Sequence, residues 1–156
     1  MDENVERVIN YLKKYNLEKN VIVLNESSAT VVDAANALHC TTDEIAKTLA
    51  FSINDKVILI VLSGNTKIDN AKYRKEFNTK AHMLSLDVVL DKVSHPVGGV
   101  CPFAVKEDVK IYLDVSLKKH DVVYPAAGST SSAVKLTISE LETSSNYEKW
   151  IDVGKN

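Results

Sequence analysis

Residues 47–62 constrain the fold more than any other part of the sequence, because they specify a β-hairpin. Large side chains alternate with small or polar ones from Lys47 to Ile53, which is the period of a strand. Asn54-Asp55 follows as a two-residue turn, and Val57–Leu62 is a fully apolar strand. The fold must therefore contain these two strands as neighbours.

Shorter patterns on either side of the hairpin predict a mixture of helices and strands. Helical spacing of apolar residues, with Ser27-Ser28 and Thr41–Glu44 as capping sequences, indicates helical segments around residues 2–15, 31–38, 42–44, 67–80, 85–93 and 139–143. Apolar runs indicate strands at 21–24, 109–113, 121–124 and 134–138. Early helices and late strands with short connections predict an α+β fold. We expect one domain over residues 1–156 with a strongly curved, mixed sheet flanked by helices.

The overall composition indicates an ordinary globular protein. At 156 residues the chain suits one domain with a sizeable core. No apolar run approaches the ~20 residues that span a bilayer, which predicts no contact with a membrane. The start, Met1 to Val5, lacks the basic and apolar regions of a secretion signal. We therefore expect a cytoplasmic location.

The charge balance excludes a general nucleic-acid coating protein, because the formal net charge is −2. Segment 67–80 is a local exception, with five cations against Asp69 and Glu76. Two interpretations stay open for this segment. It is either a solvated helix face or a patch that contacts phosphates, such as a short stretch of RNA backbone.

Cysteine and histidine give no sign of a metal site or a disulfide framework. Cys40 and Cys101 are too few and lack ligand spacing, and His39, His82 and His120 are scattered. Each cysteine is either a small buried hydrophobe or, for Cys101, a candidate thiol within a loop. No phosphate-binding glycine motif is present either, and we expect neither a metal nor a cofactor.

That loop, Pro96-Val-Gly-Gly-Val-Cys-Pro102, concentrates two of the three prolines and two of the five glycines. Proline fixes its own φ and removes a donor, whereas Gly98-Gly99 allows positive φ and close approach of another molecule. Little in the loop can ionise, so chemistry here would come from backbone N–H groups. The composition fits a cradle for an oxyanion or carbonyl, and equally a plain tight turn.

Lys47 stands at an unexpected position in its strand. It begins the row that continues with Leu49, Phe51 and Ile53, the row expected to face the core. Its ammonium must reach past the sheet edge into water or lie partly desolvated in a pocket. In the second case it can stabilise developing negative charge or hold an anionic group.

Three segments together resemble the YbaK/prolyl-tRNA-synthetase-associated editing domain. These are Ala46-Lys-Thr-Leu49, Gly64-Asn-Thr-Lys-Ile-Asp69 and His95-Pro-Val-Gly-Gly-Val-Cys-Pro-Phe103, in this order and spacing. The resemblance covers roughly residues 20–142 and implies a barrel-like sheet. It also implies a free-standing deacylase that hydrolyses the ester of mischarged tRNA. The implied substrates are tRNA(Pro) carrying alanine or cysteine, or another small amino acid.

The resemblance also implies roles for individual residues. Lys47 corresponds to the family's functional lysine, and Gly98 and Gly99 belong to the Gly-x-x-x-Pro loop whose amides hold the ester or the terminal adenosine. Because an aminoacyl ester is already activated, water or a substrate group can attack, and Cys101 is then not the nucleophile. The expected substrate contacts are Thr30, His95, Val100, Cys101, Pro102, Gly128 and Ser129.

This sequence departs from the family pattern at four positions. Ser94 replaces a glycine found in many members. Thr30 lies where cysteine-removing members have an aromatic residue, and Ala126 and Ala133 replace their small polar and acidic contacts. These differences concern cysteine specificity and not the lysine and loop pattern.

The expected partners are the acceptor end of a mischarged tRNA and an aminoacyl-tRNA synthetase that assists binding. Lys67–Lys80 and Lys118-Lys119 are the candidate tRNA contacts. Two alternatives belong to different classes: a non-catalytic module that binds tRNA ends or a synthetase, and a thiol enzyme that uses Cys101.

Overall fold

The predicted hairpin forms the middle of the main sheet. The computed structural model describes all of residues 1–156, and in it β2 (Ile45–Ile53) pairs antiparallel with β3 (Lys56–Ser63). Asn54 and Asp55 have φ of 49° and 64°, the positive values that a tight hairpin turn of this length favours. The hairpin and its turn are therefore confirmed.

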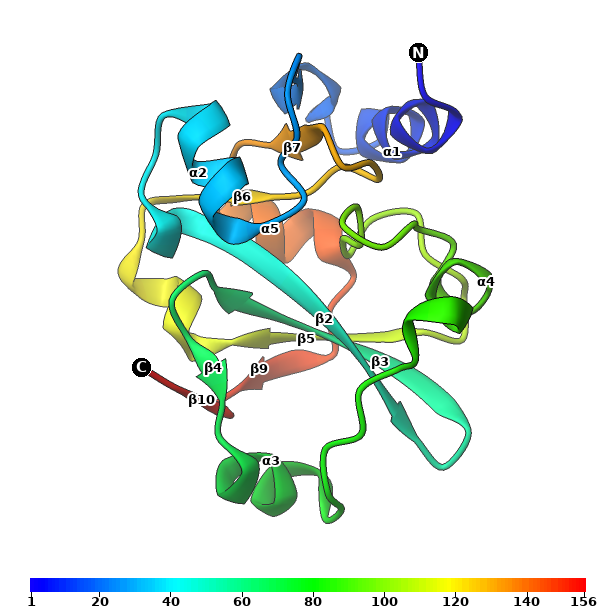
Figure 1. Cartoon of the computed structure of the whole chain (residues 1–156), viewed down its shortest axis with the longest axis vertical. Helices are drawn as coiled ribbons and strands as arrows, with labels where there is room; N and C mark the ends of the chain where they lie inside the picture. The colour runs from blue at the N-terminus through cyan, green and yellow to red at the C-terminus, as the bar shows by residue number, and fades with distance from the viewer.

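The main sheet has six strands in the order β8-β6-β2-β3-β5-β9. The added strands are β5 (Lys110–Asp114), β6 (Val122–Pro125), β8 (Leu136–Thr137) and β9 (Lys149–Ile151). The pairs β2–β6, β3–β5 and β5–β9 are parallel, whereas β2–β3 and β6–β8 are antiparallel. The sheet is strongly twisted and curls into a half-barrel (Figure 1), which confirms the expected mixed, curved sheet in an α+β fold.

Two small two-stranded sheets extend this framework. β1 (Val21–Val23) pairs with β7 (Ser132–Val134), and β4 (Lys67–Ile68) pairs with β10 (Gly154–Lys155). The predicted strand over 134–138 is therefore wrong as one element. It divides between two sheets, because β7 pairs with β1 whereas β8 pairs with β6.

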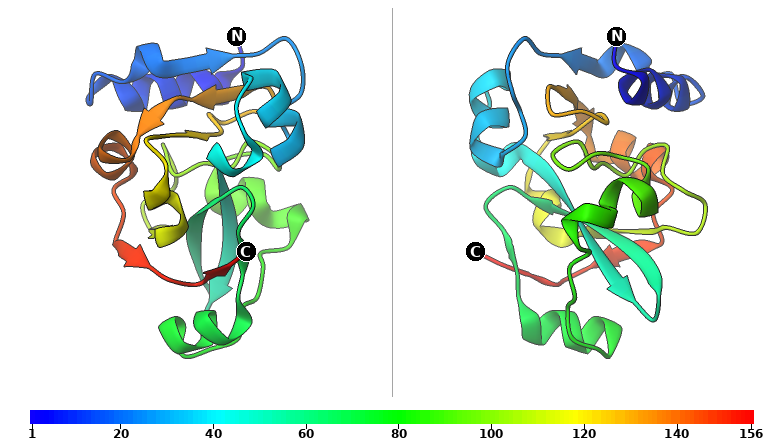
Figure 2. Two further views of the ribbon diagram at one scale, coloured as in Figure 1. Left: turned by 90° about the vertical axis from the view of Figure 1, so that its left-hand side faces the viewer. Right: turned by 45° about the vertical axis from the view of Figure 1, so that its right-hand side comes forward.

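Five α-helices surround the sheet, and all five were expected. They are α1 (Glu3–Lys13), α2 (Val31–Leu38), α3 (Asn70–Phe77), α4 (Val89–Val93) and α5 (Ile138–Ser145). Short 3-10 turns lie at η1 (Glu18–Asn20), η2 (Thr42–Glu44), η3 (Leu86–Val88) and η4 (Val115–Lys119). In Figures 1 and 2, α1 and α3 lie at opposite ends of the molecule. No helix is long and apolar enough to span a bilayer.

Helix caps explain two of these boundaries. The η2 turn begins with the expected capping box of Thr41 and Glu44. The cap of α2 is Thr30 rather than Ser27-Ser28, because its side chain accepts a hydrogen bond from the amide of Asp33 at 3.0 Å. Ser28 is instead buried and binds the carbonyl oxygen of Thr130.

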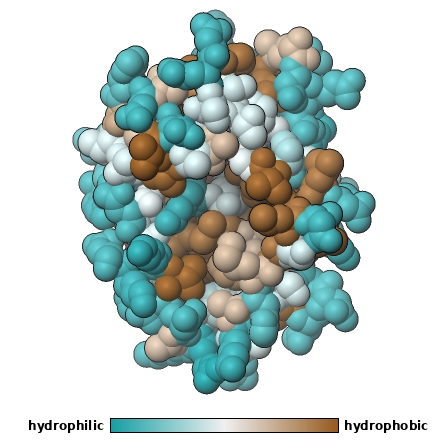
Figure 3. Space-filling model, in the orientation of Figure 1, coloured by the Kyte–Doolittle hydropathy of each residue, from teal (hydrophilic) through white to brown (hydrophobic).

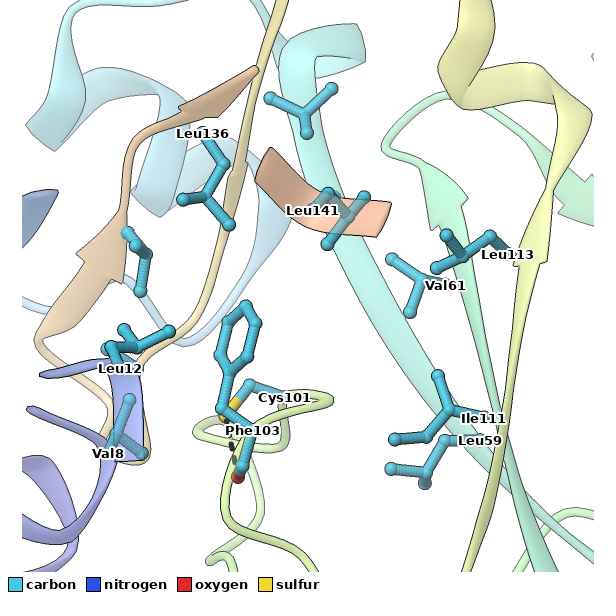
Figure 4. Close-up of a cluster of buried hydrophobic side chains, with 14 of the residues drawn as sticks. Val8, Leu12, Leu59, Val61, Cys101, Phe103, Ile111, Leu113, Leu136 and Leu141 are labelled. Carbon is cyan, nitrogen blue, oxygen red and sulfur yellow. Dashed lines mark hydrogen bonds between the residues drawn. The ribbon is translucent and has the colours of Figure 1, made fainter. Parts of the chain in front are cut away.

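Both faces of the sheet are covered, so the core divides into two main clusters. The larger cluster packs α1 and the 101–103 segment against the inner face of the half-barrel (Figure 4). The smaller one packs Phe51, Ile60 and Leu62 against Tyr73 of α3. Lys47 begins the strand row that faces this second cluster, as its spacing predicted.

Candidate functional site

A cavity of about 310 Å³ opens between α2, strand β2, the 83–89 segment and the Pro96–Pro102 loop. Of its 23 lining residues, 17 are hydrophobic and Lys47 is the only one with a charged side chain. Figure 3 shows hydrophobic residues gathered across the middle of one face of the molecule. The volume and the apolar lining are typical of a small-molecule site with one orienting charge.

The ammonium of Lys47 is half-buried at this cavity. Its Nζ donates to the carbonyl oxygen of Gly64 at 3.3 Å. Burial lowers the pKa of Lys47, the nearby cation of Lys67 lowers it further, and the carboxylate of Asp43 partly opposes both effects. The lysine thus has one neutral partner, which leaves donor capacity for an anionic or carbonyl group of a ligand.

Asp43 fixes the turn that carries the Gly64 carbonyl. Its side chain accepts hydrogen bonds from the Ser63 hydroxyl at 2.7 Å and the Asn65 amide at 3.3 Å, and its carbonyl accepts from the Gly64 amide at 3.4 Å. Burial alone would raise the pKa of Asp43. Hydrogen bonds from Lys119, Ser63 and Asn65 outweigh it and lower the pKa to about 2.

Ser63, His120 and Asp43 do not form a nucleophilic triad. A triad needs one ring nitrogen of histidine on the serine and the other on the carboxylate. Here Nε2 of His120 lies 3.0 Å from Asp43 and 3.3 Å from Ser63, and the serine hydroxyl donates to Asp43. The cluster is therefore a support for the Gly64 turn.

Three residues of the Pro96–Pro102 loop line the cavity, and their N–H groups have no acceptor in the protein: Val97, Gly98 and Val100. The amide of Gly99 donates to the carbonyl of Pro96 at 2.9 Å. Of the expected pair of donors, the structure leaves the Gly98 amide without an acceptor, whereas the turn itself uses the Gly99 amide.

Gly99 has a different reason to be glycine. A Cβ at this position would lie 2.6 Å from the Ser129 amide nitrogen and 2.7 Å from the Gly128 carbonyl carbon. At Gly98, with φ of 86°, a Cβ would lie 2.9 Å from Thr130 Cγ2. The loop thus packs backbone against backbone on the 128–130 segment, so Gly128 and Ser129 support it from behind and do not line the cavity.

Three further expected contacts lie away from the surface of the cavity: His95, Cys101 and Pro102. All three are buried, and none lines it. Nε2 of His95 donates to the carbonyl of Phe103 at 2.6 Å, and the Cys101 sulfur lies 3.4 Å from the same nitrogen. These residues shape the loop and do not line the cavity.

Burial sets the ionisation of this pair. It lowers the pKa of His95 to about 4 and raises that of Cys101 to about 12. For His95, the hydrogen bond to Phe103 opposes the shift, and Arg7 adds to it. At neutral pH the pair is a neutral imidazole and a thiol, which is not the thiolate that a cysteine nucleophile requires.

The remaining expected positions lie on the cavity wall. Thr30 begins α2 at its edge, and Ala126 and Ala133, paired through a β-bridge, form part of its opposite side. One lining group was missed by sequence reasoning. The Thr48 hydroxyl is buried and has no hydrogen-bond partner, although the residue stands beside Lys47 in the sequence.

The cavity is lined by no carboxylate and no histidine, the side chains that most often act as general bases. No cluster of three or more His, Cys, Asp or Glu side chains is arranged to hold a metal ion. The arrangement offers a cation, three backbone donors and a buried hydroxyl. It can bind a carbonyl or oxyanion in mostly apolar surroundings.

Comparison with protein families gives a match to the aminoacyl-tRNA editing domain over residues 25–143. Among curated proteins, the uncharacterized protein YwhH of Bacillus subtilis (strain 168) is 45% identical over 154 residues and 98% of each chain. A proline–tRNA ligase of Shouchella clausii is 31% identical over 102 residues, which are 65% of this chain and 18% of the ligase.

The fold has counterparts among solved structures. A crystal structure described as a candidate trans-editing enzyme for prolyl tRNA synthetase superimposes with a TM-score of 0.89. The alignment covers 100% of this chain and 99% of that one, at 22% sequence identity.

Proposed function

The chain belongs to the aminoacyl-tRNA editing domain family, and from that premise we propose that it is a deacylase that acts in trans on mischarged tRNA. Its substrate is tRNA(Pro) that carries alanine, cysteine or another small amino acid. The observation that carries the proposal is one half-buried lysine in an otherwise uncharged cavity, which is also lined by loop residues whose backbone amides have no acceptor. Residues 1–156 act as a single editing unit.

Ester hydrolysis requires what such a cavity can supply. Water attacks the carbonyl carbon of the aminoacyl ester, and negative charge develops on the carbonyl oxygen. Collapse of this intermediate expels the ribose hydroxyl and releases the amino acid. A preorganised donor at the oxyanion contributes about 3–4 kcal/mol, so the Gly98 and Val100 amides together supply much of the acceleration.

Lys47 holds the charged part of the substrate near these donors. Its ammonium binds either the oxyanion or the phosphate next to the terminal ribose, because no other lining side chain carries charge. No nucleophile of the protein is needed, since the ester is already activated. This assignment leaves Cys101 with a packing role, consistent with its complete burial.

The similarity to part of a proline–tRNA ligase supports tRNA(Pro) as the carrier. A small cavity that admits a small amino acid and excludes a larger one gives the second sieve of an editing system. A synthetase partner assists tRNA binding, because the net charge of −2 provides little general attraction for RNA. This activity belongs to the cytoplasm, where tRNA is charged.

A panel of labelled aminoacyl-tRNAs tests the proposal. Ala-, Cys-, Ser- and Pro-tRNA(Pro) and correctly charged controls are incubated with the protein, and release of the amino acid is followed. The expected result is fast release from at least one mischarged tRNA and background release from the correctly charged ones. Only background release from every aminoacyl-tRNA of the panel would overturn the proposed deacylase activity. A gel shift with tRNA would then test the alternative, a non-catalytic module that binds tRNA.

A further inference from the structure

Arg7 joins the N-terminal helix to both ends of the Pro96–Pro102 loop. Its guanidinium donates through Nη1 to the carbonyl oxygen of Ala104 and through Nη2 to that of Ser94. Nη2 also donates to the side-chain oxygen of Asn4 at 3.0 Å. One half-buried side chain of α1 therefore bridges two carbonyls that stand ten residues apart in the sequence.

The bridge depends on the shape of the guanidinium rather than on an ion pair. Arg7 belongs to none of the ion pairs of the structure. A guanidinium presents five donors in a planar fork, whereas a lysine ammonium is a compact charge on a flexible stem. Arginine can therefore hold both loop ends in one geometry, and lysine cannot.

The two bridged residues have an uncommon backbone conformation. Ser94 has φ of 80° and Ala104 has φ of 54°, in the left-handed region that residues with a Cβ rarely adopt. Such conformations persist where surrounding contacts hold them. The contact that these two residues share is the hydrogen bond to Arg7.

The same helix supports the surface against which the loop packs. A Cβ at Gly128, whose φ is 95°, would lie 3.1 Å from the carbonyl oxygen of Asn4 and 3.2 Å from Val8. Gly99 in turn packs directly on Gly128 and Ser129. Helix α1 therefore contacts the loop ends through Arg7 and the support behind the loop through Asn4 and Val8.

We propose that Arg7 is a positioning residue of the deacylation site, which fixes the Gly98 and Val100 amides by bridging the carbonyls of Ser94 and Ala104. The inference rests on the proposed function, because these amides are its oxyanion donors. It adds a residue from outside the segment that matches the family, residues 25–143. Arg7 forms no hydrogen bond with a residue that lines the cavity, so it acts only through the loop.

The test uses the full-length variants Arg7→Met, Arg7→Lys and Arg7→Ala, with Lys13→Met as the matched control. Lys13 is an exposed cation in the last turn of the same helix. Hydrogen exchange of the Gly99 amide reports on the loop without any need for activity, because this amide is hydrogen-bonded within the loop. Deacylation kinetics on the preferred mischarged tRNA report on positioning.

For Arg7→Met we expect at least tenfold faster exchange at Gly99, unchanged exchange in β2 and β3, and a loss of about 10- to 100-fold in kcat. KM changes less than kcat, because the cavity walls remain. Arg7→Lys recovers little of the loss. Millimolar guanidinium, but not sodium chloride, restores part of the kcat of Arg7→Ala, and Lys13→Met behaves as wild type.

Other outcomes overturn the inference. Unchanged exchange at Gly99 in Arg7→Met, or an increase shared equally by β2 and β3, would mean that Arg7 does not hold the loop specifically. A loosened loop with an unchanged kcat would mean that the bridge does not serve the site. If wild type cleaves no aminoacyl-tRNA, the proposed function fails, and the exchange experiment still decides whether Arg7 fixes the loop.

Discussion

Nζ of Lys47 lies 3.3 Å from the carbonyl oxygen of Gly64, so the cation at the cavity is held by a turn that follows the partner strand. Gly64 has no space for a side chain, since a Cβ would lie 1.9 Å from the carbonyl oxygen of Thr42. The position of the ammonium therefore depends on how Asp43 fixes the Ser63–Asn65 turn.

Asp43→Asn tests this support. An amide cannot accept the same set of charge-assisted bonds from Ser63, Asn65 and Lys119, and we expect about 1–2 kcal/mol lower stability and several-fold lower kcat/KM. Urea unfolding and deacylation kinetics measure the two effects. Asp108→Asn, an exposed position without a bonding partner, is the control. Equal stability and equal kcat/KM in the two variants would show that Asp43 does not support the Gly64 turn.

His95 predicts a specific pH dependence of stability. Its pKa falls from 6.5 to about 4 on folding, so between these values the unfolded chain binds more protons and stability declines as pH falls. The contribution of the neutral His95 side chain to the free energy of unfolding is complete above pH 6.5. It amounts to about 3 kcal/mol and is lost by pH 4.

Urea unfolding of wild type and His95→Gln at pH 7.5 and 4.5 measures this contribution. The variant lacks the titrating group, so its stability should change less between the two pH values. His82→Gln, at an exposed histidine, should retain the wild-type dependence. The same dependence in all three proteins would show that His95 is not neutral in the folded state.

Cys101 predicts resistance to alkylation. The thiol is fully buried and its pKa is raised to about 12, whereas Cys40 is partly exposed. Iodoacetamide should therefore modify Cys40 and spare Cys101 in the folded protein, as peptide mass spectrometry can measure. Cys101→Ala should keep most of the deacylase activity, with a stability loss of about 1 kcal/mol from the small cavity. Complete inactivation of a folded Cys101→Ala would favour the thiol enzyme instead.

Ala133→Val tests whether the cavity wall at Ala133 limits the size of the amino-acid side chain that the site accepts. The two added methyl groups enter the cavity opposite Lys47's strand, and they should reduce kcat/KM for the larger accepted amino acids about tenfold more than for alanine. Competition between two mischarged tRNAs measures the ratio. An equal loss for all amino acids would mean that Ala133 does not contact the side chain.

Much of the fold follows from local sequence. The hairpin is encoded by the Lys47–Ile53 alternation and by Asn54-Asp55, and the Thr41–Glu44 capping box appears where it was expected. β4, β9 and β10 were missed, because strands of two or three residues carry too little periodicity to detect. The helix predicted over 67–80 is wrong at its start, since Lys67–Ile68 form β4 and α3 begins at Asn70. The division of 134–138 depends on which partner strand each half meets, which is tertiary information.

The candidate site was also predictable only where local sequence patterns encode it. The row of Lys47 and the glycine loop are local patterns, and the structure brings both to one cavity. Which amides remain free depends on the turn bond between Gly99 and Pro96, and the burial of His95 depends on packing over the loop. Arg7 and Ala104 are 97 residues apart in the sequence, so no local pattern predicts their contact.

Deacylation of the preferred mischarged tRNA by Lys47→Ala and Lys47→Arg tests the central assignment most directly. Lys56→Ala, an exposed lysine at the other end of the same hairpin, is the matched control. We predict that Lys47→Ala lowers kcat/KM by about 10²–10³, that Lys47→Arg retains part of the activity, and that Lys56→Ala is unaffected. Wild-type kinetics in a folded Lys47→Ala would contradict the account.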